Sequence, residues 1–113
     1  MNNEKPWTAF YPQAATNFDR ASVEASHLAE VTGIAARNFG TRPAVSTQLP
    51  TGDCATLTYN EIERKTDDFA VYLREVANIR AADVIAVMAP NCIDFVLAVF
   101  GIFKAGCICT NIN

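Results

Sequence analysis

Residues 83–113 indicate a strand, a helix and a second strand in succession. This stretch begins Asp83-Val-Ile-Ala-Val-Met-Ala-Pro-Asn91, continues with an apolar block, and ends Gly106-Cys-Ile-Cys-Thr-Asn-Ile-Asn113. Residues 84–89 are typical of a buried strand, Pro90 ends that strand, and the apolar block has the composition of a buried helix. A second apolar run, residues 107–112, follows Gly106. Because parallel strands need a crossover connection, this order predicts a parallel βαβ unit.

The ends of the helix in this unit carry the expected signals. Asn91 is predicted to cap it, with Asp94 in the first turn, Lys104 in the last turn and Gly106 closing it. The strand at residues 84–89 is almost wholly apolar, so we expect elements to cover both of its faces. Ligands bind beyond the carboxyl ends of such strands, and residue 113 falls where such a site begins. We therefore expect catalytic residues to lie outside this chain.

The middle of the chain predicts a hairpin followed by a helix. Residues 43–48 and 55–57 are strand-like and flank Pro50-Thr51-Gly52-Asp53, which has turn chemistry. Thr58-Tyr59-Asn60-Glu61 has the spacing of a capping box that opens a helix. The apolar face of this helix is predicted to contain Tyr59, Ile62, Thr66, Phe69, Leu73 and Val76.

The first part of the chain predicts an arm and one helix. Residues 1–20 have aromatic anchors but no period, so we expect an extended arm. A helix capped by Ser22 or Ser26 is expected to run to about Asn38. Its buried face is expected to contain Leu28, Val31, Ala35 and Phe39.

These elements predict the α/β class, with helices packed on a small sheet, a hairpin and a parallel βαβ unit, as part of a larger N-terminal domain. The predicted organisation is an extended arm at residues 1–20 and an α/β subdomain at residues 21–113.

Composition excludes several function classes. The net charge is −3 and the nine lysines and arginines are scattered, so no basic stripe indicates nucleic acid. The apolar run at residues 92–109 is interrupted by Asp94, Lys104 and two glycines, whereas a membrane span needs about 20 apolar residues. The N-terminus lacks the apolar core of a signal peptide. We therefore expect a cytoplasmic chain without a transmembrane segment.

The four cysteines are expected to be reduced thiols. Cys107 and Cys109 lie two residues apart, so on a strand they point to one face. Zinc sites need wider spacing and a second pair of ligands. Small core residues are the favoured interpretation.

No residue is predicted to be catalytic, cofactor-binding or metal-binding. His27 is the only histidine, and a triad needs a positioned nucleophile and orienter beside it. Asp67 and Asp68 belong to a charged, solvated helix face. Gly101 and Gly106 have the spacing of a phosphate loop, but Cys107 and Ile108 stand where lysine and serine or threonine are required. Asn91 is explained as a helix cap.

Four stretches together resemble the N-terminal part of AMP-forming acyl-CoA synthetases. They are Phe39-Gly-Thr-Arg-Pro-Ala-Val45, Leu57-Thr-Tyr-Asn-Glu-Ile62, Asp83-Val-Ile-Ala-Val-Met-Ala-Pro-Asn91 and Phe100-Gly-Ile-Phe-Lys-Ala-Gly106. The end of the chain, residues 107–113, and the opening Pro6-Trp7 are similar to the bacterial long-chain fatty-acid type.

The resemblance implies a ligase that joins a fatty acid to CoA with ATP and magnesium, releasing AMP and pyrophosphate. It also implies that the phosphate cradle, metal-binding acid and catalytic lysine lie in later sequence. The chain is then an N-terminal structural fragment, inactive alone, whose partner is the remainder of the parent chain. The alternative is a free-standing interaction module that self-associates into a homo-oligomer through its aromatic arm or an open strand edge.

Overall fold

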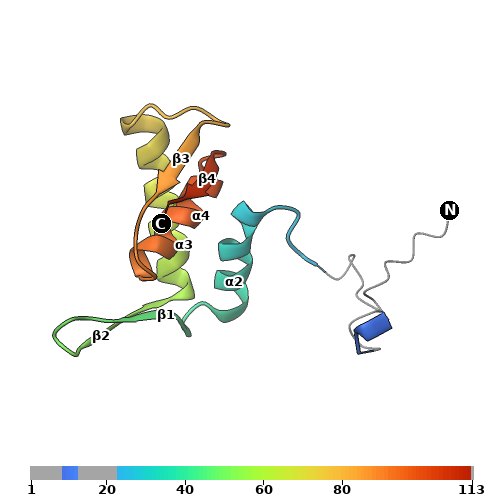
Figure 1. Ribbon diagram of the computed structural model, residues 1–113, viewed down its shortest axis with the longest axis vertical. Coiled ribbons are helices and arrows are strands. Elements are labelled where there is room, and N and C mark those ends of the chain that lie inside the picture. The colour runs from blue at the N-terminus through green and yellow to red at the C-terminus, as the bar shows by residue number, and fades with distance from the viewer. Residues whose placement is uncertain (1–8, 13–22, 113) are drawn as a thin grey trace.

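The structure is a computed structural model that describes residues 9–12 and 23–112 (Figure 1). The elements of residues 23–112 follow in chain order: η3 (Leu28–Glu30), α2 (Val31–Phe39), β1 (Pro43–Gln48), β2 (Cys54–Thr58), α3 (Tyr59–Val71), η4 (Tyr72–Val76), β3 (Val84–Val87), α4 (Ile93–Lys104) and β4 (Ile108–Asn111). The predicted α/β class is confirmed. The strands form two separate two-stranded sheets instead of one small sheet.

The predicted βαβ unit is present. β3 pairs in parallel with β4, with Val84 opposite Ile108 and Val87 opposite Asn111, and α4 connects the two strands. Gly106 has a φ of 73°, so it takes the left-handed position after α4 that the sequence predicts. Both strands are shorter than the predicted ranges, residues 84–89 and 107–112, because the ladder pairs only four residues of each.

One face of this sheet packs on the helices and the other is open. Val87 is 8% exposed and belongs to the core, whereas Val84 and Ile108 are 64% and 52% exposed. The expectation that both faces of β3 are covered is therefore wrong for the described part of the chain. The physical reason is that α3 and α4 lie on the same side of the two-stranded sheet (Figure 1).

The core lies between α3, its continuation η4, α4 and the inner face of β3 and β4. Its buried members are Ala70, Leu73, Val87, Ile102, Ala105 and Cys107. Only Gly101 and Ile102 of α4 are buried, so the prediction of a deeply buried helix is wrong for the described residues. The main neighbour of α4 is α3, and most of the other residues of α4 are half-buried.

The predicted hairpin is also confirmed. β1 and β2 pair antiparallel, with a bulge between Pro43 and Val45, and the hairpin extends away from the helices (Figure 1). β2 is one residue longer at each end than the predicted residues 55–57. Ser46 and Thr56 face each other across the pair, with 2.7 Å between their hydroxyl oxygens.

The capping box that opens α3 is formed as predicted. The Glu61 N–H donates to Thr58 Oγ1 at 3.3 Å, and the Thr58 N–H donates to Glu61 Oε2 at 2.8 Å. Each side chain thus satisfies a backbone amide that the first helical turn leaves free. The hydrogen bond from the Thr58 backbone, with the Thr58 hydroxyl second, lowers the pKa of Glu61 below its ordinary value of 4.5.

This lowered pKa predicts an acid-sensitive contribution to stability. A depressed carboxyl pKa stabilises the fold above the unfolded value and loses that effect as pH falls through the folded value. We expect Glu61→Gln to lower the melting temperature at pH 6, and the difference from the unaltered chain to shrink as pH falls below about 4.5. Thermal unfolding followed by circular dichroism measures this. Glu75→Gln, at an exposed acid outside the capping box, is the control, and an equal pH dependence in both variants would contradict the assignment.

The apolar face of α3 is as predicted except at its end. Ile62, Thr66 and Leu73 are buried, but Val76 is 64% exposed. The Ala77 N–H bonds to the Tyr72 carbonyl five residues back, so the helix widens to π geometry in η4. This wider turn rotates Val76 out of the row that a regular helix would keep.

The first helix differs more from the prediction. α2 begins at Val31 after the short turn η3, and no serine side chain caps it. Instead the Glu30 carboxylate accepts from the backbone N–H and hydroxyl of Ser26, at 2.8 and 2.9 Å. Leu28 and Phe39, expected on the buried face, are 58% and 44% exposed, and the fully buried residue of α2 is Thr32.

The predicted arm at residues 1–20 lies mostly outside the described residues, as does Ser22. Within residues 9–12, Phe10 is 88% exposed. The division into an arm and a subdomain stays a prediction.

Candidate functional site

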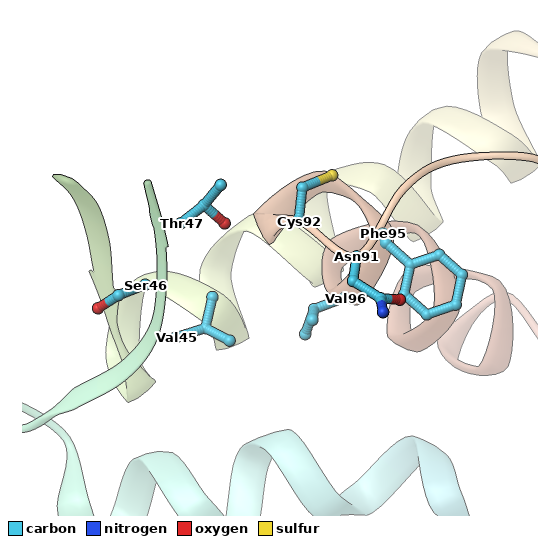
Figure 2. A pocket seen from close by; sticks show the side chains of 7 residues that line it. All are labelled: Val45, Ser46, Thr47, Asn91, Cys92, Phe95 and Val96. Atoms are coloured by element: carbon cyan, nitrogen blue, oxygen red, sulfur yellow. The ribbon is translucent and has the colours of Figure 1, made fainter. Parts of the chain in front are cut away.

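A pocket of about 330 Å³ lies between the hairpin and the start of α4. Its walls are residues 45–47 of β1 on one side and Asn91, Cys92, Phe95 and Val96 on the other (Figure 2). Val45 and Val96 lie on opposite sides of the pocket, and Thr47 lies across it from Cys92 (Figure 2). The pocket joins two supersecondary units that are far apart in sequence.

A hydrogen bond fixes the geometry of this pocket. The Ile93 N–H, in the first turn of α4, donates to Thr47 Oγ1 at 3.0 Å. The prediction that Asn91 caps α4 is wrong, because Cys92 occupies the N-cap position and makes no side-chain cap bond. Thr47 supplies the acceptor from 46 residues away. Local spacing rules do not detect a partner at that separation.

Removal of this acceptor has a predictable cost. Thr47→Val keeps the branched shape that suits a strand but leaves the Ile93 amide without its acceptor. We expect the free energy of unfolding to fall by about 1 kcal/mol, the net value of one partly buried hydrogen bond. Urea unfolding measures this, with Thr110→Val on the exposed part of β4 as control. A similar change in both variants would assign the effect to the substitution type instead.

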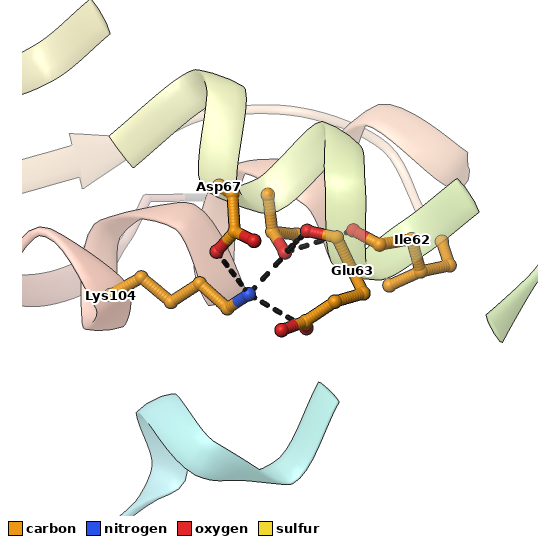
Figure 3. Close-up of polar contacts among 5 residues, drawn as sticks. Ile62, Glu63, Asp67 and Lys104 are labelled. Carbon is orange, nitrogen blue, oxygen red and sulfur yellow. Dashed lines mark hydrogen bonds and ion pairs between the residues drawn. The ribbon is translucent and has the colours of Figure 1, made fainter. Parts of the chain in front are cut away.

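A second polar feature joins α3 to α4. Lys104 Nζ lies 2.7 Å from Glu63 Oε2 and 2.6 Å from Asp67 Oδ1, and it also donates to the Glu63 carbonyl at 3.4 Å (Figure 3). The Lys104 side chain is 9% exposed, that of Glu63 29% and that of Asp67 58%. The cluster thus holds the largely buried Lys104 side chain, with its ammonium between two carboxylates that are more exposed. From the sequence alone, Asp67 is assigned to a solvated helix face and this cluster is not detected. The signal that could have found it is Lys104, the single lysine in an apolar helix.

The other residues considered from the sequence stay separate from these features. His27 is 63% exposed in its side chain, and its Nε2 lies 3.3 Å from Glu30 Oε1. Asp68 is exposed. Gly101 is buried inside α4 and Gly106 follows its end, so this pair builds no phosphate loop. The described residues thus bring none of them together as a catalytic group.

All four cysteines are free thiols in the structure. Cys107 is buried in the core and bonds through its sulfur to the Arg80 carbonyl, 3.4 Å away. Cys109 is half-buried against the same core, so the expected shared face and core role hold for this pair. Cys54 is exposed and Cys92 half-buried.

The described residues do not fit an ATP–magnesium complex by themselves. They contain no group of three or more histidine, cysteine or acidic side chains placed to hold a metal ion. The acids Glu63 and Asp67 are already paired with Lys104. The pocket at the hairpin has no basic side chain in its lining for a phosphate. The prediction that this chain offers no catalytic, cofactor or metal ligand stays a prediction.

Among the helices of the described residues, none has the length and apolar character to cross a membrane.

Sequence comparison relates the chain to known ligases. The model of the family described as AMP-binding enzyme matches residues 34–113. The chain is 33% identical over 110 residues to the long-chain-fatty-acid–CoA ligase of Haemophilus influenzae and 31% identical over 113 residues to that of Yersinia pestis. Each alignment covers 97% of this chain but only 18% of the relative. The chain thus spans under a fifth of the length of these curated relatives.

Solved structures share the fold. A fatty acyl-adenylate ligase from L. pneumophila, solved with acyl adenylate and pyrophosphate, matches with a TM-score of 0.72 at 18% identity, over 85% of this chain and 17% of the other. The N-terminal subdomain of Klebsiella oxytoca NpsA matches with a TM-score of 0.66 at 16% identity, over 75% of this chain and 21% of the other. The family model matches residues 34–113, which contain both the hairpin and the βαβ unit. This chain therefore belongs to the AMP-binding enzyme family.

Proposed function

We propose that this chain is the N-terminal structural part of an AMP-forming fatty-acid–CoA ligase and is inactive alone. The proposed reaction of the whole enzyme joins a fatty acid and CoA to give acyl-CoA, with ATP split to AMP and pyrophosphate. The main support is the alignment of nearly the whole chain with under a fifth of two long-chain ligases. ATP, magnesium and CoA are the proposed cofactors and substrates, held by residues outside this chain, and a cytoplasmic location is part of the proposal.

The role proposed for this part is scaffolding. The carboxyl ends of β3 and β4 form the edge at which open parallel sheets bind ligands. Val84 and Ile108 are exposed on the outer face of the same sheet. Both features suit a subdomain that packs against more of the same polypeptide, the proposed partner. The arm at residues 1–20 is proposed as a separate segment of this subdomain.

Reading the gene beyond codon 113 is the first test. We expect an open reading frame of several hundred further codons that encodes a Ser/Thr/Gly-rich loop ending in lysine. The longer protein should release pyrophosphate from ATP only when a fatty acid is present, and the 113-residue chain should release none. A stop codon at that point, or activity of the short chain, would overturn the proposal.

Self-association of the isolated chain is the second candidate. Val84 and Ile108 are opposite each other in the ladder and both exposed on the outer face, and each two-stranded sheet has open edges. We expect light scattering to show concentration-dependent association that the double substitution Val84→Lys with Ile108→Lys abolishes. A clean monomer of the unaltered chain at high concentration would contradict this.

A further inference from the structure

The helix α2 packs outside the hydrophobic core. The buried members of the core, and the half-buried side chains packed against them, all lie between residues 69 and 109, so α2 supplies none of those described. The main neighbour of α2 is α3. The one buried residue of α2 is Thr32, and its hydroxyl has no hydrogen-bond partner among the described residues, which destabilises the closed position. Apolar burial therefore supports α2 less than it supports α3 or α4.

Gly33 leaves room on α2 for a carboxylate of α3. A Cβ placed on Gly33 would lie 3.1 Å from Glu63 Oε1, closer than side chains normally pack. The other oxygen of this carboxylate, Oε2, lies 2.7 Å from Lys104 Nζ (Figure 3). One carboxylate of α3 thus lies against the backbone of α2 and binds the lysine of α4.

Charges of alternating sign continue from Glu63 in both directions. Lys104 Nζ also lies 2.6 Å from Asp67 Oδ1. On α2, Arg37 Nη1 lies 3.6 Å from the position of the added Gly33 Cβ, and Arg37 Nη2 lies 3.6 Å from Glu24 Oε1. The side chains of that outer pair are 67% and 62% exposed, so the pair contributes little. Glu63, at 29%, is the less exposed charge through which α2 and α4 are connected.

We propose that α2 opens and closes as a unit separate from the core, and that its closing is coupled to the Lys104–Glu63 ion pair. The bond to Lys104 fixes the Glu63 carboxylate at the place that a side chain at residue 33 would occupy. Loss of the ammonium releases this carboxylate and so changes the packing of α2, although the lysine lies on α4. Opening uncovers the face of α3 on which α2 packs. This conformational device does not depend on the proposed ligase reaction.

Native-state hydrogen exchange tests the separate opening. The backbone amides of Ala35 and Ala36 lie inside α2, and those of Thr66 and Ala70 lie inside α3. In the unaltered chain we expect the α2 amides to be at least about tenfold less protected, since a segment that opens locally exchanges without global unfolding. Their exchange should also depend less on added urea, because a local opening exposes less surface. Equal protection and equal urea dependence of the two helices would overturn the proposal.

Gly33→Ala tests the coupling to Lys104. Alanine is the better helix former, so where its methyl group fits, protection of the α2 amides should rise about fivefold. In the unaltered chain the methyl group meets Glu63 Oε1, which can retreat only at the expense of the bond to Lys104, so we expect no gain. Glu63→Ala removes the carboxylate and Lys104→Met releases it. We expect the full gain in both of these backgrounds.

Two controls separate this contact from general effects. Asn38→Ala, at an exposed position of α2 outside the Gly33 contact, should raise protection equally in all three backgrounds. Glu63→Ala leaves Lys104 paired with Asp67, so this background decides alone if Lys104→Met does not fold. An equal gain from Gly33→Ala with and without Glu63 would also overturn the proposal, because Glu63 would then not limit the packing of α2 at residue 33.

Discussion

Gly101→Val is expected to lower the free energy of unfolding by about 3 kcal/mol, at the upper end of the cost of overpacking a core. A Cβ at Gly101 would lie 2.5 Å from Phe69 Cδ1 and 3.2 Å from Phe69 Cβ. The contact with the ring decides the cost, because the Phe69 ring must leave its place in the packing of α3 on α4, close to Ile102, which is 1% exposed. The contact with Phe69 Cβ needs a shift of only a few tenths of an ångström. Urea unfolding of the two proteins measures the difference.

A double-mutant cycle isolates this contact. Phe69→Ala removes the ring while it keeps Cβ, so Gly101→Val should cost less than about 1 kcal/mol in that background. The glycine otherwise weakens α4, because glycine is about 1 kcal/mol worse than alanine inside a helix. If Gly101→Val costs the same with and without the ring, the close approach of α3 and α4 is not what requires glycine.

The capping box could be predicted from the sequence, whereas the contact of Gly101 with Phe69 could not. Thr58 and Glu61 are three residues apart, and their interaction depends on local backbone geometry alone, so spacing identifies it. The hairpin and the βαβ unit follow from local periodicity in the same way. Gly101 against Phe69 depends on how two helices meet in space, and no local pattern records that.

At the candidate site, too, a contact between elements far apart in sequence could not be predicted from a local pattern. Sequence reasoning assigned the start of α4 to Asn91, since a capping residue is normally the nearest suitable side chain. The acceptor is Thr47, which the hairpin brings to the helix from 46 residues away. Burial was overestimated on β3 and α4 for a related reason: an apolar run predicts that a surface is to be covered, but not which polypeptide segment covers it.

We expect the fold to lose more stability when the two acids of the Lys104 cluster are replaced than when the lysine is replaced. The double substitution Glu63→Gln with Asp67→Asn should lower the free energy of unfolding by about 3 kcal/mol, because it leaves Lys104, whose side chain is 9% exposed, without a counter-charge. The amide oxygens that replace the carboxylates still accept hydrogen bonds, which keeps the cost near the lower end for an unpaired buried charge. Asp68→Asn with Glu75→Gln is the matched control, since both acids are exposed and it removes the same net charge.

Lys104→Met should cost less than about 1 kcal/mol in the same urea measurement. Methionine fills the space of the lysine stem and has no charge to bury. The carboxylates it leaves behind are 29% and 58% exposed, so water solvates them, and their mutual repulsion along α3 costs only about 0.2–0.5 kcal/mol. The buried end of the ion pair therefore determines the energetic consequence of breaking it. Equal losses from Lys104→Met and from the acid pair would show instead that attraction between the charges, and not burial of the ammonium, dominates this junction of α3 and α4.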